Sequence, residues 1–310
     1  MSNNQNIYVI GKGVIAKALA VALSLQGKNV TIIRGSVDHG EAYHENIFVS
    51  TGDQTVNAKI AINTFASHDK LDGLILLANK SFGNDKLAER LEKYGKDLPI
   101  VFLQNGLGVE KAFIDRGFTQ LYRCVLMATS QVIAETDEVR LKVVAPSPIG
   151  IIKGSNENLN EIVKQIDARL FPFRVEENIQ VLIWKKVITN CVFNSICPLL
   201  EIDNGVFHRN AAALKIGEKI IAECIAVANA NGIILTVDDV NQNVLAISKM
   251  SDGQKISTYQ DILNKRETEI ETLNFAVAKL GRISGYDLPF TSMLGEMTRL
   301  KSELFREQRQ

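Results

Sequence analysis

Residues 7–16 read Ile-Tyr-Val-Ile-Gly-Lys-Gly-Val-Ile-Ala, and this stretch decides the fold of the N-terminal half. Four apolar residues predict a buried strand, and the spacing of apolar residues from Ala16 to Leu25 predicts a helix. In the intervening loop, one glycine allows a tight turn and the next lets the backbone approach a pyrophosphate. The alternative is a strand-to-helix turn with chance glycines. We predict a dinucleotide-binding turn made by Gly11, Lys12, Gly13, Val14, Ile15 and Ala16.

Short apolar strands alternate with helical patterns through the first half of the chain. This alternation is typical of a parallel sheet covered by helices, so we predict an α/β domain with a Rossmann-type, doubly wound sheet. The expected strands are Val30–Ile33, Leu74–Ala78 and Ile100–Leu103, followed by a strand-rich stretch over 124–152, and the expected helices include Asp85–Tyr94 and Asn158–Leu170.

Long helical patterns dominate after residue 178. We therefore predict two domains, a nucleotide-binding domain over residues 1–177 and an all-α substrate domain over 178–310. The expected helices are Gln180–Leu200, Ala211–Ala230, Val237–Lys249, Ile256–Leu280 and Phe290–Arg306. Their apolar faces could support a homodimer or form the core of the domain itself.

The composition excludes several classes of function. Thirty-five basic residues balance thirty-five acidic ones, so no overall field attracts nucleic acid or an anionic membrane. The four cysteines and four histidines follow no metal-ligand spacing, and we expect no bound metal. We also expect a cytoplasmic protein, because no signal peptide or membrane-spanning stretch is evident.

Arg34 follows the second expected strand, where the cofactor would be selected. Enzymes that use NAD usually carry an acidic residue there, about 20 residues beyond the glycine turn, to bind the ribose 2′-hydroxyl. A guanidinium instead suits a 2′-phosphate. We therefore favour NADP(H), the alternative being a solvated surface arginine. Lys12 would add positive charge near the phosphates or point to water.

Lys186, Asn190 and Asn194 recur at every fourth residue of an otherwise apolar helix. Residues at this spacing share one helix face. Because asparagine is unfavourable inside a helix, the pattern indicates either a stripe that faces a substrate or a hydrogen-bond network between helices. The residues alone leave both interpretations open.

Two further segments carry polar residues that could reach a ligand. Residues 104–108, Gln-Asn-Gly-Leu-Gly, follow a buried strand at the sheet edge where ligands bind, although they could be only a tight turn. Ser257 and Glu269 would lie roughly 120° apart on one regular helix. They fit a common site only if a helix begins near Ser257 or wraps beside the cleft.

These motifs together resemble the ketopantoate reductase (2-dehydropantoate 2-reductase) family over nearly the whole chain. The resemblance rests on the glycine turn with Arg34, on the Lys-Ser-Phe segment at 80–82 and on the Gln-Asn-Gly-Leu-Gly segment. It rests further on Trp-x-Lys-x3-Asn-x3-Asn at 184–194, Asn-Gly at 204–205, Ser-x3-Asp at 257–261 and Thr-Glu-Ile at 268–270.

The resemblance implies a reduction of ketopantoate to pantoate by NADPH, on the route to pantothenate and coenzyme A. It implies that Lys186 polarises and protonates the keto oxygen. Lys80 would bind cofactor, and Asn105 would contact both cofactor and substrate. The remaining substrate contacts would come from Asn190, Asn194, Asn204 and Ser257, and Glu269 would be a catalytic carboxylate that also contacts the cofactor.

The sequence departs from the family pattern in several places, which include Ala16 at the third position of the glycine turn and the region behind Asn204. Residues 129–144 lack expected glycines, and Asn274-Phe275 stands where an Asn-Gly pair is common. A different branched 2-keto acid is therefore an alternative substrate, and a non-catalytic NADPH-binding sensor is an alternative function. An opine- or hydroxyacid-type dehydrogenase would need a catalytic histidine beside a carboxylate, and none of the four histidines lies in such a motif.

Overall fold

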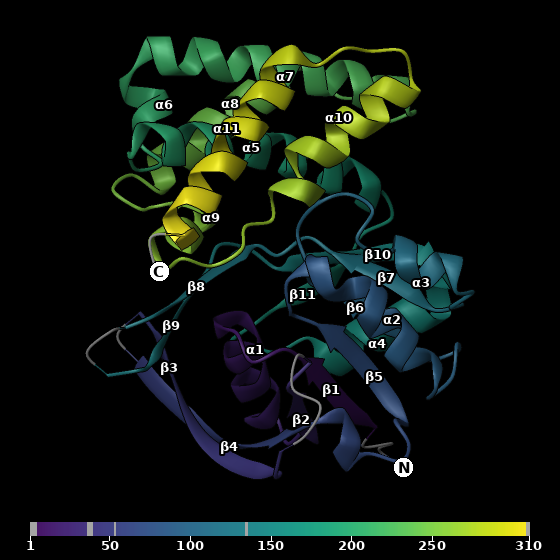
Figure 1. Ribbon diagram of the computed structural model, residues 1–310. Helices are drawn as coiled ribbons and strands as arrows, with labels where there is room; N and C mark the ends of the chain where they lie inside the picture. The colour runs from purple at the N-terminus through teal and green to yellow at the C-terminus, as the bar shows by residue number, and fades with distance from the viewer. Residues whose placement is uncertain (1–4, 36–39, 53, 134–135, 308–310) are drawn as a thin grey trace. The chain divides into compact units, whose positions relative to one another are not determined.

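The computed structural model describes residues 5–35, 40–52, 54–133 and 136–307, which fall into two compact units (Figure 1). The first unit takes in the chain up to Gln104 and then residues 109–179. The second takes in Asn105–Gly108 and residues 180–310. A loop that lies between two strands of the first unit in sequence therefore belongs by its contacts to the second.

One sheet runs through the first unit and holds eleven strands, counted over the described ranges. The strands are β1 (Asn6–Ile10), β2 (Val30–Ile33), β3 (Tyr43–Thr51), β4 (Gln54–Asn63), β5 (Gly73–Leu77), β6 (Ile100–Phe102), β7 (Leu121–Cys124), β8 (Ala128–Val132), β9 (Val139–Val143), β10 (Ser147–Lys153) and β11 (Phe173–Val175). Their order is β11-β10-β7-β6-β5-β1-β2-β4-β3-β9-β8. The centre, from β2 through β7, is parallel. Antiparallel pairs occur at β3–β4, β8–β9 and β7–β10.

Helices cover both faces of this sheet. Because side chains alternate along a strand, Ile7 and Val9 of β1 enter one core together with α1 (Val14–Ser24) and α4 (Asn156–Ile166). Tyr8 and Ile10 enter the opposite core together with α2 (Asn84–Glu92) and α3 (Lys111–Asp115). Two-sided coverage of a parallel sheet confirms the predicted Rossmann-type α/β fold.

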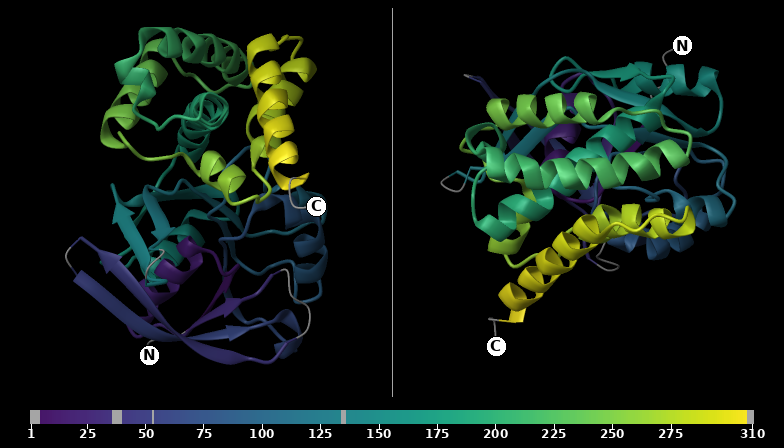
Figure 2. Two further views of the ribbon diagram at one scale, coloured as in Figure 1. Left: turned by 60° about the vertical axis from the view of Figure 1, so that its left-hand side comes forward. Right: turned by 90° about the horizontal axis from the view of Figure 1, so that it is seen from above.

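The second unit is helical, as predicted. Its helices are α5 (Ile179–Leu200), α6 (Val206–Arg209), α7 (Ala211–Ala230), α8 (Val237–Met250), α9 (Ser257–Leu263), α10 (Asn274–Ile283) and α11 (Pro289–Glu307), with the short 3-10 helix η3 (Ile270–Thr272). Figure 2, left, looks along α5, with α7 and α8 on one side and the yellow α10 and α11 on the other. From Val187 to Pro198 every residue of α5 except Asn190 is buried, as expected for a helix that is apolar on most sides.

The prediction of a single helix over Ile256–Leu280 is wrong. The chain forms α9, leaves the helix, and starts α10 only at Asn274. The end of α9 is a Schellman motif, in which the Arg266 amide donates to the Asp261 carbonyl and the Lys265 amide to the Ile262 carbonyl. Lys265 takes the left-handed conformation (φ 54°). Glycine usually holds this position, so no residue of the sequence marked the helix end.

Two other elements differ from prediction. Helix α4 covers Asn156–Ile166 rather than continuing to Leu170. It ends because the Asp167 side chain accepts the Phe173 amide (2.9 Å) and closes a turn. The hairpin of β3 and β4 was not predicted, although every residue from Tyr43 to Thr51 pairs with β4.

All four cysteines are buried and are free thiols. Burial raises the pKa of Cys197 to about 12. Among the described residues, no helix combines the length and apolar character that crossing a membrane requires.

Candidate active site

The glycine turn packs tightly against the end of a neighbouring strand. Gly11 has φ +110°, and a Cβ built there would lie 2.9 Å from the backbone nitrogen of Asn79, just beyond β5. The Gly11 amide also donates to the carbonyl of Ile33 at the end of β2 (2.8 Å). Only glycine fits this position, because both the dihedral angle and the lack of space exclude a side chain.

The space around Gly13 is open, in contrast to the tight packing at Gly11. A Cβ built there would meet no described atom within 4 Å. Gly13 is the N-cap of α1, and within the described chain no side chain caps this helix and no acidic residue lies in its first turn. The unsatisfied N–H groups of a helix start attract anions. Of the three residues that follow, Val14 and Ile15 are half-buried and Ala16 is fully buried. The turn therefore fits a dinucleotide pyrophosphate.

Arg34 lies directly beyond β2 and is held by the start of the next hairpin. One guanidinium nitrogen donates to the carbonyl of Glu41 (3.0 Å), and the guanidinium carbon lies 5.3 Å from the centre of the Tyr43 ring. The Nε atom is buried and has no hydrogen-bond partner in the ranges that the structure describes. The side chain is thus fixed by contacts on one side rather than solvated along its length.

Lys12 belongs to the same group of charges. Its amine contacts the Glu45 carboxylate (2.6 Å) and donates to the Tyr43 hydroxyl (2.8 Å), while Lys17 pairs with the other Glu45 oxygen (2.7 Å). Burial would raise the pKa of Glu45, but hydrogen bonds from Lys12 and Lys17 lower it below its ordinary value. No motif in the sequence indicated Tyr43 and Glu45, because they reach the turn only through the hairpin of β3 and β4.

Lys80 and its neighbours follow β5 at the same edge of the sheet. Lys80 is half-buried and precedes a short 3-10 helix, Ser81–Gly83, in which Ser81 is buried and Phe82 exposed. Asn79, the residue before Lys80, is the one whose backbone limits the space at Gly11. Because β1 and β5 are parallel neighbours, Lys80 lies near the glycine turn.

The polar stripe of α5 combines one basic residue with two amides. Lys186 and Asn190 are half-buried, and Asn194 is 2% exposed. The Asn194 side-chain oxygen accepts the backbone amide of Thr258 (3.4 Å). This bond orients the Asn194 amide so that its NH2 group remains a donor for another partner. The interpretation as a hydrogen-bond network between helices is therefore confirmed at Asn194, and the interpretation as a stripe that faces a substrate stays a prediction.

Ser257 is the first residue of α9, so the helix begins where a site shared with Glu269 requires. Asn204 lies in the turn between α5 and α6, and its backbone amide donates to the carbonyl of Gln254 (2.8 Å). Asn204 is 5% exposed. Its side-chain oxygen is buried without a hydrogen-bond partner among the described residues. Asn194 and Asn204 therefore both contact the segment 254–258 that leads into Ser257.

The Asn105 loop joins the segment that Glu269 begins. The Leu107 amide donates to the Thr272 carbonyl (2.8 Å), and the Thr272 amide donates to the Glu269 carbonyl (3.1 Å). Gly106 has φ +99°, and a Cβ there would collide with the Thr272 side chain. Asn105 and Glu269 are both half-buried. Backbone contacts thus connect two predicted site residues that are far apart in the sequence.

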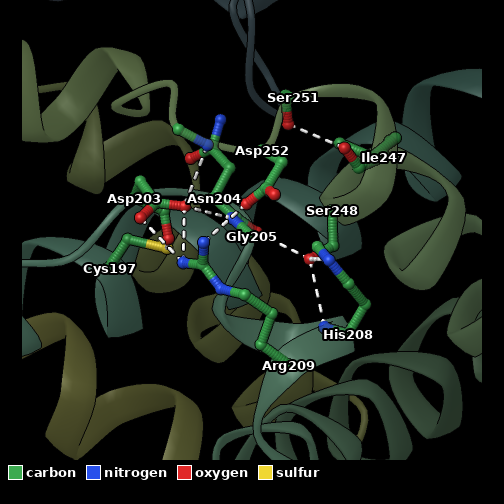
Figure 3. Close-up of polar contacts among 11 residues, drawn as sticks. Cys197, Asp203, Asn204, Gly205, His208, Arg209, Ile247, Ser248, Ser251 and Asp252 are labelled. Atoms are coloured by element: carbon green, nitrogen blue, oxygen red, sulfur yellow. Dashed lines mark hydrogen bonds and ion pairs between the residues drawn. The ribbon is translucent and has the colours of Figure 1, made fainter.

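A set of charged residues holds the turn that contains Asn204 (Figure 3). Arg209 donates to both oxygens of Asp203 (2.8 and 2.7 Å) and to Asp252 (2.7 Å). Asp203 also accepts the backbone amides of Gly205 (2.7 Å) and Gly253 (3.1 Å). The sequence did not single out Asp203 or Arg209. Their only signal was that they flank the Asn-Gly pair.

The two units offer complementary chemistry. The first presents a helix N-terminus and two cations, which suit the phosphates of a nucleotide. The second presents an amine, several amides and a carboxylate, which suit a small substrate rich in oxygen. A Rossmann-type unit whose glycine turn fits a dinucleotide pyrophosphate, in one chain with a helical unit that carries the polar stripe of α5, is typical of two-domain nicotinamide-dependent oxidoreductases.

The chain belongs to the ketopantoate reductase family. The model of "Ketopantoate reductase PanE/ApbA" matches residues 7–149, and that of its C-terminal domain matches residues 178–302. A 2-dehydropantoate 2-reductase of Pyrococcus horikoshii is 25% identical over 299 residues, which cover 96% of this chain and 98% of the relative. One of Streptococcus pyogenes serotype M1 is 25% identical over 307 residues, which cover 97% and 99%.

Solved structures share the fold over almost the whole chain. A D-mandelate dehydrogenase, in a ternary structure with NADH and anilino(oxo)acetate, superposes with a TM-score of 0.83 at 22% identity, covering 97% of this chain and 99% of that one. A ketopantoate reductase from Staphylococcus aureus, described as dimeric, gives 0.81 at 19% identity with the same coverage.

Replacing Asp203 with Asn should lower stability at neutral pH and make stability less sensitive to acid. Hydrogen bonds from Arg209 lower the pKa of Asp203 from 3.8 to about 2. A carboxylate with a lowered pKa in the folded state adds stability above about pH 4 and loses that contribution as the pH falls towards 2. The thermal midpoints of wild type and D203N, measured from pH 7 downwards, should therefore converge below about pH 4.

Asp287→Asn, at an exposed aspartate of the same unit, is the matched control. A difference between wild type and D203N that stays constant over this pH range would contradict the assignment.

Proposed function

We propose that the protein reduces ketopantoate to pantoate with NADPH and so supplies pantoate for pantothenate and coenzyme A synthesis. The observation that carries the proposal is the polar stripe of α5. A half-buried lysine and two asparagines share one face of a helix that is otherwise buried almost throughout its C-terminal half. Membership of the ketopantoate reductase family and the names of relatives that match nearly the full chain support the same activity.

Lys186 would act on the keto oxygen. A nicotinamide cofactor, when bound, supplies the hydride that adds to C2 of the keto acid. As the hydride adds, the carbonyl π electrons move to oxygen, and the Lys186 ammonium stabilises that charge and donates a proton to form the hydroxyl group. The neutral amine then regains a proton from solvent. A positioned general acid of this kind typically contributes ~10²–10⁴-fold in rate.

The neighbouring polar residues would bind and orient the substrate. Asn105, Asn190, Asn194, Asn204 and Ser257 offer amide and hydroxyl donors that suit the carboxylate and hydroxyl oxygens of ketopantoate. Asn194 is pre-oriented for this, since its oxygen is already engaged by the Thr258 amide. Glu269 would order the site as a carboxylate beside Lys186 and the cofactor.

The first unit would hold the cofactor. The open turn at Gly13 and the N-terminus of α1 suit the pyrophosphate, and Arg34 suits the 2′-phosphate. Lys12 would add positive charge near the phosphates, and Lys80 would lie beside the bound nucleotide. The family accounts for a nicotinamide cofactor. The preference for NADPH over NADH rests on Arg34 standing where an acidic residue would bind the ribose diol.

The helical unit would also support a homodimer. Exposed apolar residues recur along α11 at Met293, Met297, Leu300 and Leu304, and the spacing places them on one helix face. The Staphylococcus aureus relative is described as dimeric.

Turnover is tested by mixing the purified protein with NADPH and ketopantoate and following the loss of NADPH absorbance. We expect steady oxidation that depends on both compounds. Oxidation with another branched 2-keto acid, and not with ketopantoate, would identify the divergent reductase instead. Binding of NADPH without turnover of any acid in the panel would identify the non-catalytic sensor.

Lys186→Ala should lower kcat by ~10²–10⁴-fold and leave NADPH affinity nearly unchanged, because the proton donor is lost while the nucleotide contacts remain. Lys185→Ala is the matched control, since Lys185 is the adjacent residue and also half-buried. Equal turnover in the two variants would refute the proposed role of Lys186.

Arg34→Ala should raise Kd for NADPH by more than about tenfold and that for NADH by less than about twofold, because only NADPH carries the 2′-phosphate. Fluorescence titration of each nucleotide measures both constants. Arg140→Ala, which removes an exposed arginine of β9, is the control. Equal losses for the two nucleotides would mean that the 2′-phosphate binds elsewhere.

A further inference from the structure

The turn between α5 and α6 is fixed by one arginine with two acidic partners. The two terminal nitrogens of Arg209 contact different carboxylates, Asp203 in the turn itself and Asp252 beyond the end of α8 (Figure 3). A guanidinium presents its donors in a rigid, planar fork. Arg209 therefore fixes the turn relative to the loop after α8 in orientation as well as in distance.

Asp203 extends this link to the backbone. The Oδ1 atom of Asp203, which accepts a hydrogen bond from Arg209, also accepts the amides of Gly205 and Gly253, so one atom joins both loops. Gly205 has no room for a side chain, because a Cβ there would collide with the Asp252 carboxylate. The two loops are thus in direct contact, with Asp203 and Asp252 on either side of Gly205.

Asn204 lies at the centre of these contacts, and its backbone is bound at both ends. Its amide donates to the Gln254 carbonyl (2.8 Å), and its carbonyl accepts the Ser248 hydroxyl (2.7 Å). Because the Ser248 proton is used in that bond, the His208 ring must donate through Nδ1 to the Ser248 oxygen (3.0 Å). The fixed backbone sets the direction of the Cα–Cβ bond of Asn204, and the buried side-chain oxygen has no partner among the described residues.

Stability alone does not account for this arrangement. The Arg209 side chain is 46% exposed, and exposed ion pairs contribute little to the free energy of folding. A bidentate contact combined with a second carboxylate is instead a means of fixing geometry. The group that it orients is a buried side-chain oxygen without a hydrogen-bond partner in the described part of the chain.

We propose that Arg209 is a positioning residue for substrate binding, which holds the 203–205 turn so that the Asn204 side chain meets the keto acid. The inference rests on the proposed function, in which Asn204 binds substrate. Arg209 itself touches no substrate atom and acts through Asn204. The sequence pattern of the site therefore extends from the Asn-Gly pair to Asp203, Arg209 and Asp252.

Arg209→Gln is the first test. We expect KM for ketopantoate to rise about tenfold, as for one weakened substrate contact, with kcat within about twofold and Kd for NADPH unchanged. Arg209→Lys, which keeps the charge but not the fork, should raise KM less. Arg282→Ala removes an exposed arginine of α10 and should leave KM unchanged.

A double-mutant cycle separates positioning from a merely structural role. If Arg209 acts through Asn204, the R209Q/N204A double variant should have the KM of N204A alone. Additive increases in KM, or an unchanged KM in R209Q, would overturn the inference. Should R209Q fail to fold, Asp252→Asn loosens only the link to the loop after α8 and should raise KM in the same direction. An unchanged KM in D252N would count against the inference equally.

Amide hydrogen exchange reads the turn without any substrate. In R209Q the amides of Asn204, Gly205 and Gly253 should exchange faster than in wild type, and unchanged exchange would mean that Arg209 does not hold the turn. A wild-type protein without activity on any 2-keto acid would refute the proposed function and, with it, the substrate role of the turn. An active wild type with unchanged kinetics in R209Q would refute the inference alone.

Discussion

The burial of α5 is the constraint on which the second unit depends. A helix enclosed by its neighbours cannot carry polar side chains without cost, because an amide removed from water without a hydrogen bond loses about 1–3 kcal/mol. Asn194 is 2% exposed. It avoids this cost because its side-chain oxygen accepts a hydrogen bond from the backbone amide of Thr258, in the first turn of α9. The same bond fixes where α9 begins and so places Ser257. One buried amide therefore links the lysine-bearing helix to the start of another.

Local signals in the sequence predicted most of the fold. The strand at residues 7–10, its glycine turn and α1 were predictable, because each depends on neighbours within a few residues. The end of α9 was not, since Lys265 takes a left-handed conformation that a lysine rarely adopts, within a turn closed by the hydrogen bonds to Ile262 and Asp261. The hairpin of β3 and β4 escaped prediction too, because its alternation of apolar and polar residues is weak near Tyr43.

The candidate site divides in the same way. The spacing of Lys186, Asn190 and Asn194 was readable because a helix has a fixed period. The residues around them could not be predicted. Arg209 contacts Asp252 across a separation of 43 residues. The loop of Asn105 contacts Thr272, although in sequence this loop lies between two strands of the first unit. Which side chains hold a site in place depends on their distances in the folded structure, and these distances leave no periodic pattern in the sequence. They became visible only once the fold had brought the turns together.

Electrostatics at the glycine turn distinguishes the two cations that could select the cofactor. The charge of Lys12 is already opposed by Glu45, which also receives Lys17, so this group of three carries a net charge of only one. A phosphate bound at Lys12 would compete with the Glu45 carboxylate, which already pairs with this lysine. Among the described residues Arg34 instead contacts a carbonyl oxygen and an aromatic ring, neither of which neutralises it. A guanidinium without an acidic partner gains more from a phosphate than a paired ammonium does. On the contacts of the described residues, the identity of residue 34, rather than residue 12, should govern the choice between the two nucleotides.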